Sequence, residues 1–405
     1  MAYHYLTGHH LGQAASNSTS LNTISPSTYR VKRGHNRSPR RWLLSLIASA
    51  VMLSACSTAT ASQSGGTGTK RGTTVAPPHL VVTTGPKHTR VFHNVFDPSV
   101  IDASSGIYLG WVFAHPGSAQ SRSAVVRIDR ANAKVLSTNV LAGSIEAGVA
   151  TNRHLWITSS NAPSKAILYE FNADNLTLTR TIPLIGTDPG TSMATTNSYL
   201  WVSEGDQLLR IDRRDANLRK QVKLTAAFSA TVSTDTQDHL LVVAIANRGG
   251  QGRIEIRSGA NANLIGTSAS LNGVFAPRTA AVGKNIWISE ATGNMGYVSR
   301  YRLRGLTPTV AGCPSSLLTN SPTCILGSNG LQVNASHQLI FLSQVAGGGA
   351  RNACIDPSNG SIVAQLPLAP TDQLLTIGHS HLFVMTQTRR ENVVELPIPS
   401  ACLGG

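Results

Sequence analysis

Short apolar runs recur along the chain at a nearly constant spacing. The three clearest copies carry a tryptophan between two aliphatic residues and occupy residues 154–159, 199–204 and 285–290. Weaker copies lie at residues 107–110, 239–244, 340–343 and 381–385, so the bulky central positions are 40 to 54 residues apart. Self-similarity at a period of about 40 to 50 residues is typical of propellers, and it predicts the architecture of the repeated part of the chain.

Each repeat also has the same internal order of apolar and polar segments. A weakly alternating segment precedes the apolar run, and a loop, a third run with an Asp or Asn turn and a fourth short run follow it. Four short strands separated by turn residues predict one antiparallel blade. A β-sandwich would not repeat one four-strand unit, and no helical period of apolar residues interrupts the pattern. The predicted fold class is all-β: a seven-bladed β-propeller of four-stranded antiparallel blades over residues 78–405.

Closure of such a ring leads to two further predictions. A single blade cannot bury both of its faces, so we expect Trp156, Trp201 and Trp287 to pack against the neighbouring blade. An open ring would leave unpaired strand edges. We therefore expect a segment among residues 79–95, either 79–84 or 90–95, to join the last blade as its closing strand.

The repeats resemble those of the YVTN and NHL-like propeller families. The best matches are residues 355–364 (Ile-Asp-Pro-Ser-Asn-Gly-Ser-Ile-Val-Ala) and 128–135 (Ile-Asp-Arg-Ala-Asn-Ala-Lys-Val), and the similarity extends over about residues 90 to 400. The fourth and fifth repeats depart from the pattern, because residues 254–257 and 298–301 lack its Asp. The resemblance implies the propeller fold. It implies no particular activity, since this fold carries lyases, hydrolases, carriers and scaffolds.

The first 55 residues have the features of an export leader. Arg40 and Arg41 precede a mainly apolar stretch of twelve residues, 42–53, which is too short to span a bilayer and suits a signal peptide. Residues 53–56 (Leu-Ser-Ala-Cys) resemble the lipobox of bacterial lipoproteins, which implies that Cys56 receives a diacylglycerol and becomes the new N-terminus. An ordinary cleaved secretory signal is the alternative. Residues 1–30 look unlike an export signal, and a start at Val31 would give a conventional basic region.

The leader predicts where the protein works. Acyl chains on Cys56 would anchor it to a bacterial membrane on the extracytoplasmic side. Residues 56–77 are rich in Ser, Thr and Gly, so we expect a flexible tether between the lipid and the propeller.

The chain is basic, with a formal net charge of +15. Residues 1–55 hold six basic and no acidic residues, so the remainder has a net charge of about +9. This balance favours anionic lipid headgroups or acidic envelope polymers as partners. Nucleic acid is not expected, because the basic residues are scattered rather than clustered.

Four cysteines besides Cys56 lie in the last quarter of the chain: Cys313, Cys324, Cys354 and Cys402. An even number in an oxidising compartment favours two disulfides, and three pairings are possible. The simplest choice joins Cys313 to Cys324 within one extended loop and Cys354 to Cys402. A zinc site is the other interpretation, but no Cys-x-x-Cys pair or nearby His supports it.

Catalytic signals are few. His154, His239 and His381 share one position, the turn before the second strand, and that position recurs around the ring rather than converging. In the same way, Asp129, Asp212 and Asp356 recur at the turn after the third strand, where an Asp side chain can bond its own turn. We expect no cofactor, metal site or catalytic residue from these patterns.

If a ligand site exists, its expected place is the mouth of the central channel. Glu204, Glu290 and Gln344 end the second strands of three repeats and would face that rim.

Two functions fit the sequence. The first is a monomeric, non-catalytic lipoprotein whose propeller binds an envelope protein, a polymer or a small molecule. The second is a Mg²⁺-dependent enzyme similar to the streptogramin B lyases, which share the Leu-Trp-(Val/Phe)-(Ser/Thr)-Glu phrase matched by residues 200–204 and approached by 286–290. That resemblance implies a His and a Glu beside bound Mg²⁺, and no His-x-Glu or Glu-x-His motif is found. Binding is therefore favoured.

Replacement of Cys56 by Ser tests the anchor. Because the thiol is the only group that the lipid could be joined to, the variant should leave the membrane fraction or accumulate as unprocessed precursor. Mass spectrometry of the mature wild-type N-terminus is the check, and a mature protein without covalent lipid would refute the assignment.

Overall fold

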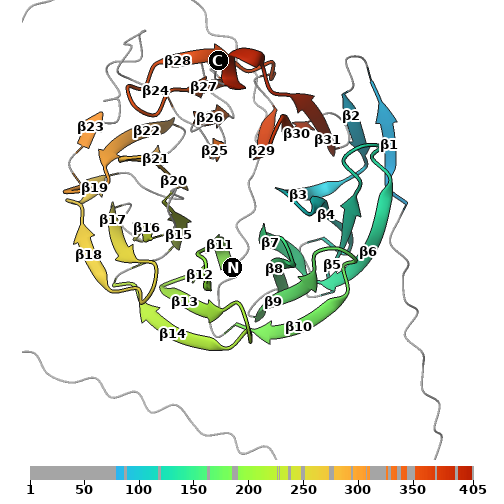
Figure 1. Cartoon of the computed structure of the whole chain (residues 1–405), viewed down its shortest axis with the longest axis horizontal. Helices are drawn as coiled ribbons and strands as arrows, with labels where there is room; N and C mark the ends of the chain where they lie inside the picture. Colours follow the sequence, from blue (N-terminus) through green and yellow to red (C-terminus); the bar gives the residue numbers. More distant parts are fainter. Residues whose placement is uncertain are drawn as a thin grey trace, which may run out of the picture. The chain divides into compact units, whose positions relative to one another are not determined.

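Antiparallel strands make up almost all of the regular structure. The computed structural model describes residues 79–403, apart from gaps at 86–88, 117–119, 162–164, 185–189, 226, 228, 236–238, 248–250, 273–277, 293–294, 307, 311–324, 327–329, 335–338, 344–351, 370–371 and 388–390. These described residues form seven sheets, which surround a common centre as the blades of a propeller (Figure 1). The predicted all-β propeller fold is confirmed. No helix in the described residues is both long and apolar enough to cross a membrane.

We number the blades 1 to 7 in chain order. Blade 1 consists of β3 (Phe96–Ala103), β4 (Gly106–Ala114), β5 (Arg122–Ile128) and β6 (Val135–Ala142). Blade 2 consists of β7 (Ser144–Ala150), β8 (His154–Asn161), β9 (Lys165–Asn172) and β10 (Leu178–Pro183). Blade 3 consists of β11 (Gly190–Thr195), β12 (Tyr199–Glu204), β13 (Gln207–Asp212) and β14 (Leu218–Lys223).

Blades 4 and 5 each carry one additional short strand. Blade 4 consists of β15 (Ser229–Thr234), β16 (Leu240–Ala246), β17 (Gln251–Ser258) and β18 (Leu264–Thr267), and β19 (Leu271–Asn272) also pairs with β17. Blade 5 consists of β20 (Arg278–Val282), β21 (Asn285–Thr292), β22 (Met295–Arg302) and β23 (Pro308–Val310), and β24 (Ile325–Leu326) also pairs with β22. Blade 6 consists of β25 (Gly330–Asn334), β26 (Leu339–Ser343), β27 (Ala353–Ile355) and β28 (Ile362–Gln365).

Blade 7 closes the ring by combining both ends of the described chain. It consists of β29 (Gln373–Ile377), β30 (His381–Gln387) and β31 (Glu391–Pro397), followed by β2 (Arg90–His93) and then β1 (Val81–Thr84). The pairing of β2 with β31 confirms the predicted closing strand, and β1 adds a fifth strand outside it. A 3₁₀ turn, η2 (Ser400–Leu403), ends the described part of the chain.

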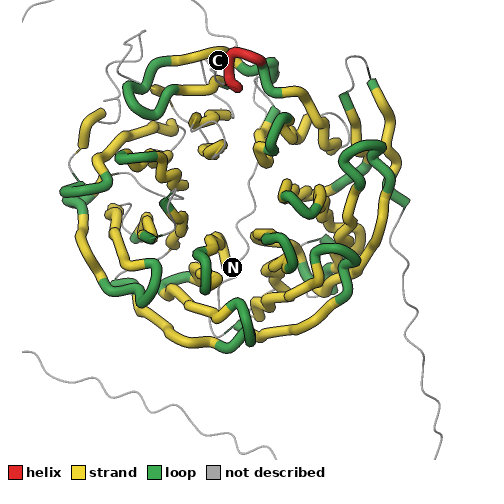
Figure 2. The backbone as a smooth tube through the Cα atoms, in the orientation of Figure 1, coloured by secondary structure: helices red, strands yellow, loops and turns green. Residues whose placement is uncertain are grey.

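The first strand of each blade lies nearest the centre of the ring, and the fourth strand lies at its circumference (Figure 2). The turns between first and second strands and those between third and fourth strands therefore share one rim, which we call the turn rim. The remaining connections lie on the opposite rim. Residues of these two kinds of turn can therefore lie close together, whereas residues on opposite rims cannot.

Second strands are buried on both faces, which explains their unbroken apolar sequences. In β8, Leu155 and Ile157 belong to a buried cluster shared with blade 1, whereas Trp156 belongs to a cluster shared with blade 3. Further clusters of the described residues join blades 3 and 4, 4 and 5, 6 and 7, and 7 and 1. Trp156, Trp201 and Trp287 are each 0% exposed, as predicted for core residues between blades.

The turn between the third and fourth strands has one residue in the left-handed backbone region. In blades 1 to 6, the φ angle of this residue is 59° at Ala133, 55° at Leu176, 55° at Ala216, 58° at Ala262, 48° at Leu306 and 82° at Gly360. A side chain in this conformation costs about 1 to 3 kcal/mol. Only one of these six residues is glycine, so most of the turns carry a side chain despite that cost.

Packing between blades accounts for those side chains. Trp156 shares a cluster with Ala216 of the next blade, Trp201 with Ala262, and Tyr108 with Leu176. At the same position in blade 6, a Cβ on Gly360 would lie 3.4 Å from Cη2 of Trp287. The largest side chains thus face Ala or Gly, whereas the smaller tyrosine faces Leu.

The disulfide between Cys354 and Cys402 confirms one of the two predicted pairs. It joins β27 to η2 across 48 residues of sequence, and both cysteines are 0% exposed. Cys313 and Cys324 lie outside the described residues, so their pairing stays a prediction.

Reduction should destabilise the ring mainly through the Cys354–Cys402 bond. Opening a loop of this length is expected to cost about 3 to 4 kcal/mol in the chain-entropy model. Cys402→Ser should therefore reproduce most of the loss of thermal stability that reduction causes, whereas Cys313→Ser should not. Non-reducing peptide mapping that found Cys324 joined to Cys354, or free thiols throughout, would contradict this.

Gly378 should be intolerant of any side chain. It lies in the first turn of blade 7, where a Cβ would be 1.7 Å from Oδ2 of Asp102, a carboxylate that is 2% exposed and ion-paired with Arg130. Gly378→Ala should lower the free energy of unfolding by about 1 to 3 kcal/mol. Gly266→Ala is the matched control, because its Cβ would meet only Leu306 at 3.7 Å. Equal urea midpoints for the two variants would contradict the expected clash.

Candidate functional site

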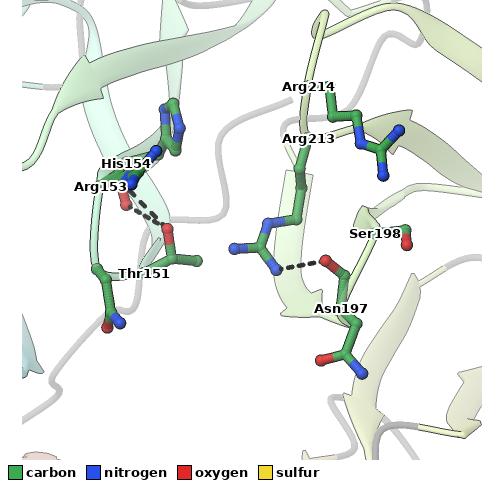
Figure 3. Close-up of a pocket in the computed structure, with 8 residues that line it drawn as sticks. Thr151, Arg153, His154, Asn197, Ser198, Arg213 and Arg214 are labelled. Carbon is green, nitrogen blue, oxygen red and sulfur yellow. Dashed lines mark hydrogen bonds between the residues drawn. The ribbon is translucent and has the colours of Figure 1, made fainter.

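A hollow of about 420 Å³ lies on the turn rim between blades 2 and 3. Three turns supply its walls, and the lining residues are Thr151, Asn152, Arg153, His154, Asn197, Ser198, Arg213 and Arg214. Figure 3 shows the blade 2 residues on one side and the blade 3 residues on the other, with the guanidinium of Arg213 directed between them.

Hydrogen bonds between turns hold these walls in place. Nη1 of Arg213 donates to the carbonyl oxygens of Thr196 and Asn197, at 2.7 and 3.1 Å. The backbone N–H of Arg213 donates to the carbonyl of Ser198 at 3.1 Å, and in blade 2 that of Ala173 donates to the carbonyl of Arg153 at 3.0 Å. In each blade the two turns are therefore joined to one another, so the hollow is built on a fixed scaffold.

The lining is strongly basic. It holds three arginines and a histidine, and none of its residues is acidic. The side chains of Arg153 and Arg214 are exposed, and neither forms a hydrogen bond or ion pair with a described residue.

Three carboxylates of these two blades already have partners. Arg219 forms ion pairs with Asp212, at 3.4 Å, and with Asp215. Glu170 contacts Nδ1 of His154 at 2.7 Å and Nε of Arg180 at 3.5 Å. Arg153 and Arg214 are paired with none of these carboxylates, so their donors suit a ligand with anionic oxygen atoms.

Sequence reasoning did not find this site, because its residues come from three turns in two repeats. The available signal was the pair Arg213 and Arg214 directly after the Asp212 turn, together with Arg153 at the corresponding rim of the preceding repeat.

Two of the residues predicted to line the channel mouth lie in the described part of the chain, in different blades. Glu204 ends β12 on the opposite rim from the hollow, and its side chain is only 1% exposed. Glu290 lies within β21, paired in register with Tyr297, two blades further on. Gln344 lies outside the described residues. A ligand role for these three residues stays a prediction.

The recurring Asp residues bond their own turns, as expected. Oδ1 of Asp129, Asp212 and Asp356 accepts the backbone N–H two residues later, at 2.7, 2.9 and 2.8 Å. Hydrogen bonds from the hydroxyl and backbone N–H of Ser358 hold the pKa of Asp356 below its usual value.

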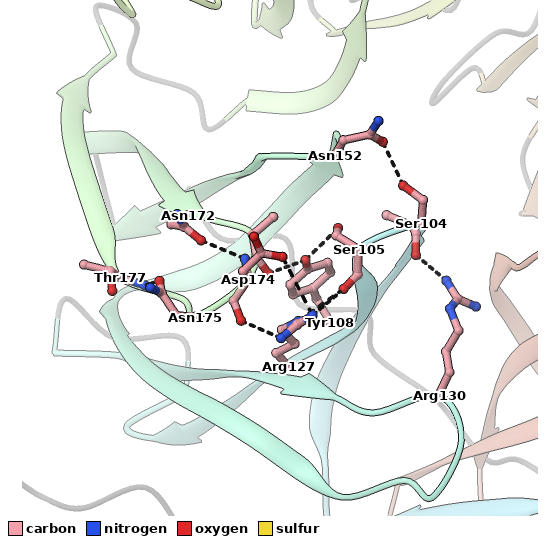
Figure 4. A network of polar contacts seen from close by, with 12 residues as sticks. Ser104, Ser105, Tyr108, Arg127, Arg130, Asn152, Asn172, Asp174, Asn175 and Thr177 are labelled. Carbon is pink, nitrogen blue, oxygen red and sulfur yellow. Dashed lines mark hydrogen bonds and ion pairs between the residues drawn. The ribbon is translucent and has the colours of Figure 1, made fainter.

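Third-strand arginines reach the same turns from the preceding blade. Arg127 donates to the carbonyl of Asp174, and the hydroxyl of Tyr108 beside it donates to the carbonyl of Ala173 at 2.6 Å (Figure 4). Equivalent bonds join Arg210 to the carbonyl of Ala260 and Arg300 to that of Ser358. These arginines are therefore engaged in joining blades.

Each recurring histidine contacts a residue of its own blade. His154 contacts Glu170, and Nδ1 of His381 lies 3.7 Å from Glu395. Burial raises the pKa of Glu395, against the opposing effect of Arg90. The backbone N–H of His239 donates to Asp235 at 2.9 Å. Within the described part of the chain, no three His, Cys, Asp or Glu side chains gather in a way that could hold a metal ion.

Comparisons with known proteins identify the fold and no family. No family model matches the chain, so the resemblance to the YVTN and NHL-like families stays a prediction. No curated protein matches it either.

Many solved structures share the fold at very low sequence identity. A structure of BamB from Moraxella catarrhalis is 8% identical with a TM-score of 0.52, covering 78% of this chain and all of that one. A chain of the mitotic checkpoint complex is 10% identical with a TM-score of 0.55, covering 81% and 98%. The Pan2 WD40 domain of Neurospora crassa is 10% identical with a TM-score of 0.51, covering 76% and 90%. These similarities support the propeller fold alone.

Proposed function

We propose that this protein is a lipid-anchored extracytoplasmic lipoprotein of a bacterial envelope, and that its propeller is a non-catalytic scaffold that binds another envelope component. The observation that carries the binding role is the basic hollow on the turn rim. It is built from turns that are fixed by hydrogen bonds, and rigid scaffolds commonly present binding residues on such turns.

Two further observations support the location and the role. The buried Cys354–Cys402 disulfide is of a kind that persists in oxidising compartments, which agrees with export. One propeller of similar fold comes from a structure described as a complex, the mitotic checkpoint complex, so this fold takes part in multi-protein assembly elsewhere.

Site-specific photo-crosslinking in intact cells tests the binding role. A photoreactive amino acid at Ser198, on the wall of the hollow, should yield an adduct of defined mass in the membrane fraction. The same amino acid at Leu264, which is 53% exposed on the outer strand of blade 4, is the control and should yield none. The Cys56→Ser variant should lose the adduct together with the anchor.

Two outcomes would contradict this function. The first is a failure of Ser198 to give a specific adduct, either no adduct at all or the same set of adducts as Leu264, because the hollow would then not be a preferred contact surface. The second is Mg²⁺-dependent breakdown of a streptogramin B by the purified wild-type protein, which would favour the lyase.

A further inference from the structure

We propose that the hollow between blades 2 and 3 binds an acidic segment of a partner polypeptide, with its carboxylates held between Arg153 on one wall and Arg214 on the other. This inference rests on the proposed scaffold function and adds the surface used and the chemistry of the partner.

Unsatisfied charge is the first argument. Arg153 and Arg214 extend from two different blades, and no described carboxylate pairs with either. Asp212 and Asp215, which are close enough in sequence to neutralise Arg214, are instead paired with Arg219. A guanidinium presents a planar fork of N–H donors that matches a carboxylate in two parallel hydrogen bonds. An incoming acidic side chain could therefore bind these guanidinium groups without breaking an existing ion pair.

The other lining side chains favour a polypeptide over a purely anionic polymer. Asn197 and Ser198 offer acceptors as well as donors. Oδ1 of Asn152 is already occupied, because it accepts from the hydroxyl of Ser104 at 2.8 Å. A peptide backbone brings an N–H and a carbonyl at each residue, so it can use both kinds of group. A polyphosphate has only acceptors, and it would leave the amide oxygen of Asn197 unused.

The size and rigidity of the hollow agree with a short segment. Its volume of about 420 Å³ lies in the range of ligand sites, roughly 300 to 1,000 Å³, and exceeds what one carboxylate would fill. Because hydrogen bonds already join the turns that form the walls, little ordering should be needed on binding.

One part of the opposite rim, at β31, β3 and β7, carries carboxylates instead. There the backbone N–H of Asp97 donates to Oε2 of Glu391 at 2.7 Å. Partial burial raises the pKa of Asp97, and the neighbouring carboxylate of Glu391 raises it further. Burial, and to a smaller extent Asp97, also raises the pKa of Glu146. These three carboxylates therefore lie close together, and this part of the opposite rim is less favourable for an acidic segment than the hollow.

Binding of a fluorescein-labelled hexaglutamate peptide to the purified propeller tests the inference. Arg153→Gln and Arg214→Gln should each weaken binding by about fivefold, because each removes one exposed ion pair. Arg122→Gln removes an equally exposed charge on the opposite rim and should change the affinity by less than about twofold. Arg213 is left unchanged, since its bonds to Thr196 and Asn197 hold the wall. Hexaglutamine should not bind.

Four results would overturn the inference. Equal losses in Arg122→Gln and the two hollow variants would indicate general charge attraction. No binding of hexaglutamate by the wild type would remove the site. Tight binding of polyphosphate that depends on Arg153 and Arg214, without binding of hexaglutamate, would assign the hollow to another anion. The fourth is a crosslink from Ser198 that persists in Arg153→Gln and Arg214→Gln, which would refute this inference and leave the scaffold function standing. A protein with both arginines intact that gives no crosslink from Ser198 would instead refute the scaffold function itself.

Discussion

The contact on which the ring depends is the packing of one large second-strand side chain against the strained turn of the next blade. Trp156 and Ala216, Trp201 and Ala262, and Trp287 and Gly360 repeat one geometry. A left-handed residue with a side chain is unfavourable by about 1 to 3 kcal/mol, so the conformation persists because the surrounding packing holds it. In the pairs of Trp201 and Trp287 the same turn also accepts a hydrogen bond from an arginine of the preceding blade, Arg210 or Arg300. Arg127 does the same in the pair of Tyr108 and Leu176. Apolar packing and polar bonding thus converge on one element.

The charged residue that lies opposite the aromatic side chain, on the third strand, is of two kinds. In blades 1, 3 and 5 the third-strand residue opposite the aromatic side chain is Arg. In blades 2 and 7 that residue is Glu170 or Glu395, and an Arg on the adjacent fourth strand pairs with it. His154 and His381 occur in these two blades and contact the same Glu residues. His154 and His381 are therefore explained by their contacts with the buried Glu of the adjacent strand.

The sequence predicts features that every repeat shares, and it does not predict features that depend on how distant segments meet. The tryptophan period and the closing strand could be predicted, because strand pairing and two-sided burial act on every repeat alike. The sequence offered residues 79–84 and 90–95 as alternatives, and it did not predict that both β1 and β2 would join blade 7. The hollow could not be predicted either, since it depends on how particular turns meet in space. Glu204 shows the limit most clearly. Its place at a strand end was evident, but its side chain is 1% exposed, because burial depends on neighbouring blades.

The scaffold and its candidate site are connected, since the turns that hold the blades together also form the walls of the hollow. A thermodynamic cycle on Trp156 and Ala216 tests the central packing claim most directly. Ala216→Leu should destabilise by about 1 to 3 kcal/mol through overpacking, and Trp156→Tyr by a similar amount through lost contacts. The double variant recreates the Tyr108–Leu176 pair of the neighbouring interface, so it should recover at least about 1 kcal/mol relative to the sum of the two losses. Losses in urea unfolding that simply add would contradict the account.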